Sequence, residues 1–286
     1  MDGNLVANEI RRKIESEVES LRVTGIKPCL ATILVGNDQA SATYVKNKHI
    51  AAAKLGISTR DYKLDESTPE AELLGLVQVL NSDDDIHGIL VQIPLPSKID
   101  QQKVVNSINH LKDVDGLNPF NLGLLFSSEA RLKPCTPSGI LEIVDYYGIE
   151  LSGMDVVIVN RSNLVGKPLA MLLLQRDATV TICHSKSKNL SKILRNADCI
   201  ITAIGDRNKL VLTGSMVKKI SIIIDVGITR NQGRIMGDVD FESVKKTASH
   251  ITPVPGGVGP MTITMLLKNT IIAAKLIKNI RIENLR

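Results

Sequence analysis

The sequence predicts an α/β protein with largely parallel sheets, divided into two domains. Short runs of β-branched residues alternate with helical stretches along most of the chain, as in strands joined by crossover helices. The chain has 286 residues, which is comfortable for two domains of ordinary size. Stretches rich in Gly and Pro at 112–137 and 251–262 interrupt the alternation, and we expect the chain to cross between domains there.

The first block of the pattern predicts an N-terminal α/β domain. Gly56 is a stop signal after the second helix, and Pro69 suits the first turn of the third. The block closes on GILVQIPLP, a buried apolar run that ends in prolines. The expected elements are a helix at 5–23, a strand at 29–36, a helix at 39–55, a short strand around Tyr62, a helix at 69–81 and a strand at 88–96.

The second block predicts a compact, Rossmann-like doubly wound unit. Its expected elements are helices at 138–147, 167–175 and 188–195, and strands at 155–159, 178–183, 198–204 and 221–228. A long helix at 263–282 follows the second crossing, and we expect it to pack back on the N-terminal domain. The predicted domains are therefore 1–118 plus 263–286, and 119–262, with a cleft between them.

Composition and charge narrow the classes of partner. The chain has three Phe, four Tyr and no Trp, so a stacking surface for single-stranded nucleic acid is not expected. Lys and Arg number 35 against 30 Asp and Glu, and the excess is spread along the chain. This distribution argues against a dedicated nucleic-acid or membrane binder and fits an anionic small-molecule ligand.

The cysteines and the N-terminus indicate a cytoplasmic protein. Cys29, Cys135, Cys183 and Cys199 show no CxxC pair and no His partner at metal-ligand spacing, so we interpret them as reduced, buried thiols. The N-terminal segment mixes acidic and basic residues and lacks the apolar core of a signal peptide. No uninterrupted apolar stretch approaches the roughly 18 residues of a membrane span.

The second block has the layout of a nucleotide site without the usual glycine fingerprint. Asn160, Ser162 and Val165 stand where GxGxxG would place glycines, while Gly166 permits close packing and Pro168 suits a first helical turn. A strand, a short loop and a helix N-terminus still offer backbone N–H groups to a phosphate. A loop that binds no cofactor is the alternative at this point.

The next strand favours NADP over NAD. An NAD site places an acidic residue at the end of this strand, but residues 178–197 contain no Asp or Glu. The strand instead runs into His184, Ser185 and Lys186, which together with Arg161 could hold a 2′-phosphate. The alternative is a solvated basic loop.

In the first block, Tyr44 and Lys48 lie four residues apart and therefore share a helix face, which Ala51 and Leu55 continue. A partly desolvated lysine has a lowered pKa and can act as a general base. The alternative is a lysine whose stem lies at the edge of a packed helix while its amine reaches solvent.

Two further segments place polar groups near the same region. Gln92 ends a buried strand, where open parallel sheets bind their ligands. Asp113 and Asp115 lie in KDVDG, where Asp before Gly is ordinary turn chemistry. A cleft between domains would also place such a carboxylate beside a ligand.

Taken together, the motifs resemble one family. YVKNK, VQIPLP, KDVDGLNP, PCTPSGI, RSNLVGKP, CHSK, IIIDVGI, GDVDF and PVPGGVGPMT occur in the order found in the bifunctional methylenetetrahydrofolate dehydrogenase/methenyltetrahydrofolate cyclohydrolase family. The resemblance runs from about residue 5 to about residue 270. It implies NADP-dependent oxidation of 5,10-methylene-tetrahydrofolate, then hydrolysis of the methenyl product to 10-formyl-tetrahydrofolate. No metal ion is implied.

The resemblance also implies roles for individual residues. Tyr44 would stack on the folate, Lys48 would be the catalytic lysine, Gln92 would position it, and Asp115 would anchor the pterin. Further substrate contacts would come from Pro94, Leu95, Pro255, Gly256 and Gly257. NADP would be held by Asn160, Arg161, Ser162, Val165, Gly166, His184, Ser185 and Ile228. The expected partners are tetrahydrofolate derivatives, with polyglutamylated forms left open, and a second copy of the chain in a homodimer formed through the cofactor domains. The expected pathway is one-carbon metabolism, including purine biosynthesis.

The sequence departs from the family pattern at two positions. Asn160 replaces a glycine of the cofactor loop, and because Asn tolerates positive φ the turn is expected to survive. Gln39 replaces a proline at a helix start. Two alternatives remain at this point: another NADP-dependent dehydrogenase of a small acid, resembling shikimate dehydrogenase, and a catalytically silent NADP-binding protein.

Overall fold

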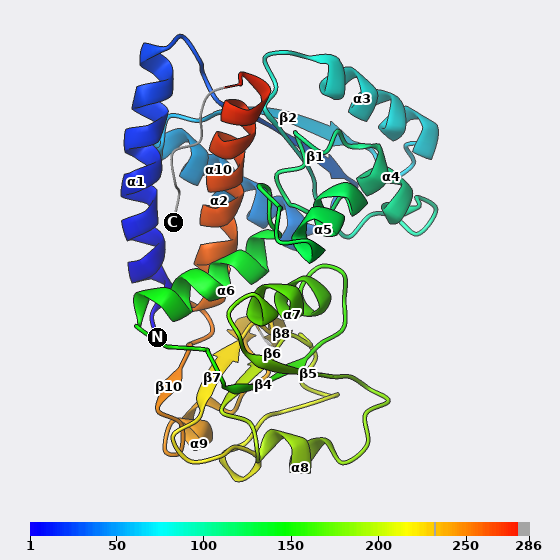
Figure 1. Cartoon of the computed structure of the whole chain (residues 1–286). Helices are drawn as coiled ribbons and strands as arrows, with labels where there is room; N and C mark the ends of the chain where they lie inside the picture. The colour runs from blue at the N-terminus through cyan, green and yellow to red at the C-terminus, as the bar shows by residue number, and fades with distance from the viewer. Residues whose placement is uncertain (232, 280–286) are drawn as a thin grey trace. The chain divides into compact units, whose positions relative to one another are not determined.

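The chain forms two compact units, each built around a parallel sheet. The computed structural model describes residues 1–231 and 233–279 (Figure 1). Unit 1 comprises Met1–Asn8 and Thr136–Thr262, and unit 2 comprises Glu9–Cys135 and Ile263–Arg286. The predicted fold class, an α/β protein in two parts with parallel sheets, is confirmed.

Unit 2 contains a three-stranded parallel sheet in the order β2-β1-β3. The central strand, CLATILV, is buried along its whole length, which explains why its sequence is apolar apart from Thr32. Ile33 lies opposite Tyr62 on one side and Val91 on the other, and β3 ends there, two residues before β1 and β2 end at Val35 and Leu64. The strands are β1 (Cys29–Val35), β2 (Ser58–Leu64) and β3 (Gly88–Val91).

Helices connect and cover this sheet (Figure 1). Parallel neighbours need crossover connections, and α2 and α3 supply them. One face of the sheet packs with α3 and α4 into a core that includes Ile33, Leu73, Ile89 and Val104. The helices that lie wholly or largely in unit 2 are α1 (Gly3–Val23), α2 (Gln39–Lys54), α3 (Glu70–Ser82), α4 (Gln101–Ser107), α5 (Pro119–Phe126) and α10 (Val258–Ile277).

The C-terminal helix α10 lies beside α1 (Figure 1). Lys275 Nζ pairs with Glu17 Oε2 at 2.7 Å, and Arg11 Nε donates to Thr264 Oγ1 at 3.0 Å. The helix begins at Val258, five residues before the predicted start at 263; the predicted residues 280–282 lie outside the described part of the chain. By length and composition α10 could cross a membrane, but 61% of the relevant window is buried in protein, as in a core helix.

Two segments differ from the sequence expectation in unit 2. The strand expected at 88–96 ends at Val91, because Pro94 and Pro96 have no N–H to donate to a ladder. The crossing expected at 112–137 contains α5, whose start is capped by Asn118 accepting a hydrogen bond from Phe120 N. Residues 119–135 cluster with unit 2, and Asn121 ties α5 to it by donating to Asp113 and to the His110 carbonyl.

Unit 1 contains a five-stranded parallel sheet in the order β10-β7-β6-β4-β5. After β4 the chain adds β5 on one side and then returns to place β6 on the other, so β4 and β6 flank a topological switch point. The strands are β4 (Asp155–Val159), β5 (Thr179–Cys183), β6 (Cys199–Thr202), β7 (Ile222–Asp225) and β10 (His250–Ile251). The other elements are α6 (Cys135–Tyr146), α7 (Gly166–Leu174), α8 (Leu190–Leu194), α9 (Phe241–Val244), a 3₁₀ turn at Gly214–Met216 and the antiparallel pair β8 (Thr229–Asn231) and β9 (Arg234–Met236).

Candidate active site

Lys48 is a buried lysine on α2, and the residue is 5% exposed. The helix starts where Asp38 accepts a hydrogen bond from Ser41 N at 2.7 Å, and from there Tyr44 and Lys48 fall on one face. The Lys48 amine lies 4.8 Å from the centre of the Tyr44 ring. A cation over an aromatic face is attracted by the ring electrons, so Tyr44 is a favourable neighbour for the charged form.

Gln92 receives the Lys48 amine directly after β3. Lys48 Nζ donates to Gln92 Oε1 at 3.1 Å, while Gln92 Nε2 donates to the Ile93 carbonyl at 2.7 Å. The Gln92 backbone N–H also bonds to the Ile33 carbonyl of β1. Because both ends of the amide are engaged, its oxygen is held toward the lysine.

Asp115 and Cys135 interact electrostatically with Lys48. Burial lowers the pKa of Lys48, and the nearby Asp115 carboxyl and Cys135 thiol oppose that change. Burial likewise raises the pKa of Asp115, while the Lys48 ammonium lowers it. The lowered pKa increases the share of neutral amine near pH 7, which is what a lysine general base requires.

Asp113 has a different role from Asp115. It is 1% exposed, and its carboxylate accepts hydrogen bonds from Gly116 N, Asn118 N and Asn121 Nδ2 at 2.8–3.1 Å. Burial raises the pKa of Asp113 to about 6, against the effect of these donors. Turn chemistry therefore describes Asp113, and the turn that it organises carries Asp115, whose pKa the Lys48 charge lowers.

The remaining predicted substrate residues lie on two segments. Pro94 and Leu95 follow Gln92 in unit 2; Pro94 is exposed and Leu95 packs against the core of that unit. Pro255, Gly256 and Gly257 belong to unit 1, where the Gly256 carbonyl accepts a hydrogen bond from Gly3 N at 2.9 Å. A Cβ on Gly257 would lie 2.5 Å from the Pro253 carbonyl oxygen, so this segment requires glycine.

Asn160 organises the predicted cofactor loop in unit 1. Its Oδ1 accepts from Ser162 N at 2.7 Å and from Gly166 N at 3.1 Å, and its Nδ2 donates to the Ala203 carbonyl at 2.5 Å. It thereby joins the ends of β4 and β6 at the switch point. The turn forms at Asn160 without the positive φ that Asn tolerates, because Asn160 is absent from the positive-φ residues of the described chain. Its side chain shapes the turn instead.

The same loop packs tightly on the start of α7. A Cβ on Gly166 would lie 2.2 Å from the Asn160 carbonyl oxygen, so only glycine permits this approach. Val165 N donates to Ser162 Oγ at 3.1 Å, which closes the loop. The positive end of the α7 dipole follows at once, as in sites that bind phosphate.

The predicted 2′-phosphate residues lie at neighbouring strand ends. Val159 of β4 pairs with Cys183 of β5, and Arg161 and Ser185 lie two residues after Val159 and Cys183, respectively. Arg161 and Ser185 are exposed, and His184 is half-buried. His184 N donates to Ser187 Oγ at 2.9 Å, which holds the β5 turn.

Sequence reasoning missed two buried acids beside the predicted cofactor site. Asp225 accepts hydrogen bonds from Gly227 N, Asp238 N and Val239 N, and Asp238 accepts from Ile204 N and Gly205 N. Burial raises the pKa of Asp225 to about 6. The two acids fix the chain after β6 and β7, including the approach of Gly205 to Ile228. The available signal was their place in the motifs IIIDVGI and GDVDF.

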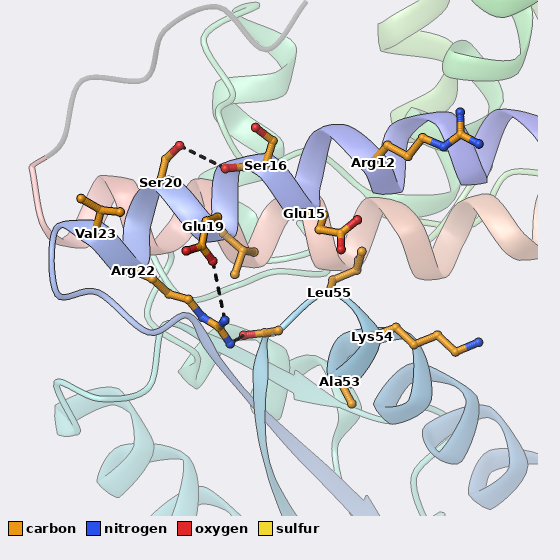
Figure 2. A pocket seen from close by; sticks show the side chains of 12 residues that line it. Arg12, Glu15, Ser16, Glu19, Ser20, Arg22, Val23, Ala53, Lys54 and Leu55 are labelled. Atoms are coloured by element: carbon orange, nitrogen blue, oxygen red, sulfur yellow. Dashed lines mark hydrogen bonds and ion pairs between the residues drawn. The ribbon is translucent and has the colours of Figure 1, made fainter.

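All four cysteines are free and buried, as predicted. Cys135 was not recognised as a neighbour of the lysine site; its motif, PCTP, was the only signal. A separate hollow of about 800 Å³ in unit 2 lies between α1 and the end of α2 (Figure 2). Its lining includes charged side chains such as Glu19, Arg22 and Lys54 and contains none of the predicted site residues.

Comparisons of the sequence and of the structure with known proteins point to the same family. The tetrahydrofolate dehydrogenase/cyclohydrolase models match this chain twice, the catalytic domain over residues 1–115 and the NAD(P)-binding domain over residues 134–278. The chain is similar to the bifunctional protein FolD of Nitrosopumilus maritimus, with 54% identity over 96% of each chain.

Two solved structures extend this similarity to the fold. The bifunctional methylenetetrahydrofolate dehydrogenase/cyclohydrolase FolD of Campylobacter jejuni is 48% identical, with a TM-score of 0.93 over 96% of this chain and 98% of that one. The Trypanosoma brucei dehydrogenase-cyclohydrolase, solved with NADP and an inhibitor, is 38% identical, with a TM-score of 0.91 over 96% and 97% of the two chains.

Proposed function

The chain belongs to the tetrahydrofolate dehydrogenase/cyclohydrolase family, and from that premise we propose that Lys48 is the centre of its active site. The enzyme oxidises 5,10-methylene-tetrahydrofolate to the 5,10-methenyl form with NADP and hydrolyses that product to 10-formyl-tetrahydrofolate. The observation that carries the site assignment is the buried Lys48 amine on Gln92 Oε1, beside Tyr44 and Asp115.

In the oxidation, the residues of the chain mainly position the substrate. Bound NADP supplies the hydride acceptor for the one-carbon bridge. Tyr44 presents a flat ring on which the folate stacks, and Asp115 offers carboxylate oxygens to the N–H edge of the pterin. Gln92 holds the Lys48 amine in place. Fixed geometry of this kind can replace much of the entropic part of a barrier.

In the hydrolysis, Lys48 acts as a base. A water oxygen forms a bond to the cationic methenyl carbon, and the neutral Lys48 amine takes one of the water protons. The carbon–nitrogen bond to the ring then breaks, and the hydroxyl proton passes to that nitrogen, which leaves the formyl product. The substrate cation lowers the pKa of Lys48 further, and Asp115 keeps the ammonium form accessible.

NADP fits the residues of unit 1. The loop of Asn160, Ser162, Val165 and Gly166 forms a cradle closed to any Cβ at Gly166, at the start of α7. Arg161 and Ser185 follow adjacent strands, and residues 178–197 supply no carboxylate to repel a 2′-phosphate. His184 and Ile228 complete the proposed contacts. The other residues proposed to contact the folate are Pro94 and Leu95 of unit 2 and Pro255, Gly256 and Gly257 of unit 1.

Finer assignments follow from the same family membership. The folate-binding catalytic domain is assigned to 1–118 plus 263–286 and the NADP-binding domain to 119–262. The clustering of residues 263 onward with 9–135 supports the placement of the C-terminal segment, whereas residues 1–8 and 119–135 cluster on the other side of these bounds. The enzyme acts in the cytoplasm on tetrahydrofolate derivatives, polyglutamylated ones included, and supplies purine biosynthesis. It forms a homodimer through the NADP-binding domains, supported by the partly exposed edge strand β5.

The Lys48→Ala variant tests the assignment, with Lys46→Ala as the matched control because Lys46 lies exposed on the same helix. Absorbance is followed with methylene-tetrahydrofolate and NADP, before and after acid, which returns the formyl product to the absorbing methenyl form. We expect hydrolysis to fall by about 10²–10⁴ in Lys48→Ala, as for loss of a general base, with NADP still bound. Hydrolysis at the wild-type rate in that variant would overturn the role of Lys48.

A further inference from the structure

Asn269 is a buried polar residue on α10 that joins two distant backbone segments of unit 2. The residue is 6% exposed. The amide Nδ2 donates to the Val114 carbonyl at 2.8 Å and to the Lys133 carbonyl at 2.9 Å. One side-chain amide therefore satisfies buried carbonyls from two segments that are almost twenty residues apart in the sequence.

The two segments are the ones that carry the polar neighbours of Lys48. Val114 precedes Asp115, and Lys133 lies two residues before Cys135. The Cys135 thiol donates to the same Val114 carbonyl at 3.2 Å, and Asn269 Nδ2 lies 3.7 Å from Cys135 Sγ. Asn269 thus lies at the junction behind Asp115 and Cys135.

The junction leaves little room for rearrangement. Gly116 has φ +71°, and a Cβ there would lie 2.5 Å from the backbone carbon of Lys133. The Asp115 turn is therefore pressed against residues 133–134, with Asn269 bonded to both. Removing the amide would leave two buried carbonyls without this donor in a place where the backbone is tightly packed.

We propose that Asn269 is a positioning residue, which holds the Asp115 turn against residues 133–135 and so keeps the Asp115 carboxylate and the Cys135 thiol within electrostatic reach of the Lys48 amine. This inference rests on the proposed role of Lys48 in hydrolysis. Asn269 acts through Asp115 and Cys135 rather than on the substrate. Docking of α10 does not depend on Asn269 alone, because Arg11 on Thr264 and Lys275 on Glu17 also attach this helix to α1.

The test is a double-mutant cycle with Asn269→Leu and Asp115→Asn. Leucine has nearly the shape of asparagine and no donor. We expect Asn269→Leu alone to lower kcat/KM for hydrolysis about tenfold, since small misplacements in a site carry costs of this order or larger. In the Asp115→Asn background, Asn269→Leu should lower kcat/KM only about twofold or less further, because the effects of substitutions at residues that act through one another are not additive.

The pH profile is the second readout. The Asp115 carboxyl opposes the effect of burial on the pKa of Lys48, so a displaced Asp115 should shift the acidic limb of the hydrolysis profile to lower pH. Asn269→Ser, which keeps one smaller donor, should fall between the wild type and Asn269→Leu in both readouts and serves if the leucine variant fails to fold.

Thr270→Val is the matched control. Thr270 is the next residue of α10, is fully buried, and donates from Oγ1 to the Leu266 carbonyl of its own helix at 2.9 Å. It should change thermal stability without moving the pH profile. The proposal would be overturned if Asn269→Leu lowered kcat/KM by the same factor in both Asp115 backgrounds. It would also be overturned if the acidic limb of the Asn269 variants stayed at the wild-type pH. Failure of the Lys48 assignment is recognised separately, by wild-type hydrolysis in Lys48→Ala measured in the same assay.

Discussion

Burial shifts the pKa of both Lys48 and Asp113, but the two shifts have different consequences. Both side chains are almost fully enclosed, and in each case burial disfavours the charged form, so the pKa of Lys48 falls and that of Asp113 rises. Lys48 gains a chemical property from this, since its neutral form can accept a proton. Asp113 instead receives backbone and amide donors that stabilise its carboxylate and fix the turn before Asp115.

The pKa of Asp113 predicts a pH-dependent contribution to stability. Its carboxyl has a pKa of about 6 in the folded chain, against an ordinary value of 3.8, so between these values the folded state holds more protons than the unfolded state. The free energy of unfolding contributed by Asp113 is therefore highest below about pH 4 and falls, by about 3 kcal/mol in all, as the pH rises through about 6.

Comparison with Asp113→Asn isolates this contribution. Denaturant unfolding of both proteins between pH 4 and pH 7.5 gives the difference in free energy of unfolding at each pH. The advantage of the wild type should shrink as the pH rises, while the wild type alone mixes this effect with those of acids whose pKa is lowered, such as Glu70 and Asp198. A difference that stays constant over the range would contradict a raised pKa at Asp113.

At the scale of elements, the ends of β6 and β7 depend on two acids rather than on glycines alone. Asp238 receives the N–H groups of Ile204 and Gly205, and Asp225 receives those of Gly227, Asp238 and Val239. These bonds set the path of the chain beside Ile228, one of the proposed NADP contacts. We therefore expect the two acids to affect cofactor affinity through the geometry of these strand ends.

We expect Asp238→Asn to weaken NADP binding about tenfold. The asparagine side chain has one acceptor oxygen, whereas two N–H groups point at this position. A buried polar group without a partner costs about 1–3 kcal/mol, and we expect the loop to move in a way that relieves part of this cost. Titration calorimetry measures the NADP dissociation constant. Asp240→Asn is the control, because Asp240 caps the neighbouring helix α9 through Ser243 N at 3.3 Å. Equal NADP affinity in Asp238→Asn and wild type would contradict the assignment.

Elements were predictable from the sequence where the signal was local. The spacing of Tyr44 and Lys48 places them on one face, and β4 lies at the predicted residues 155–159. Helix α5 was missed because its Pro, Asn and Gly resemble a turn, although Asn118 before Pro119 is an ordinary helix start. Asn269 could not be identified, because its bonds reach residues 155 and 136 positions away and no local pattern records such contacts.

At the scale of the whole molecule, β5 bears on the proposed homodimer. It is the last strand in the order of the unit 1 sheet, and Thr179, Thr181 and Ile182 on it are exposed. An edge strand presents backbone donors and acceptors to another strand, and a two-fold axis would let two copies use the same edge. The exposed Ile182 adds apolar surface to that contact.

Ile182→Lys tests this arrangement by adding a charge that would face its own copy across the axis. We expect analytical ultracentrifugation to show dimers for the wild type and mainly monomers for the variant, because like charges and a lost apolar contact both oppose association. The thermal midpoint of the wild type should rise with protein concentration, and that of the variant should not. Ile235→Lys is the control: Ile235 is exposed to a similar extent, on β9 in the antiparallel pair outside this sheet, so its charge should leave the dimer intact. A dimeric Ile182→Lys protein would place the interface away from β5.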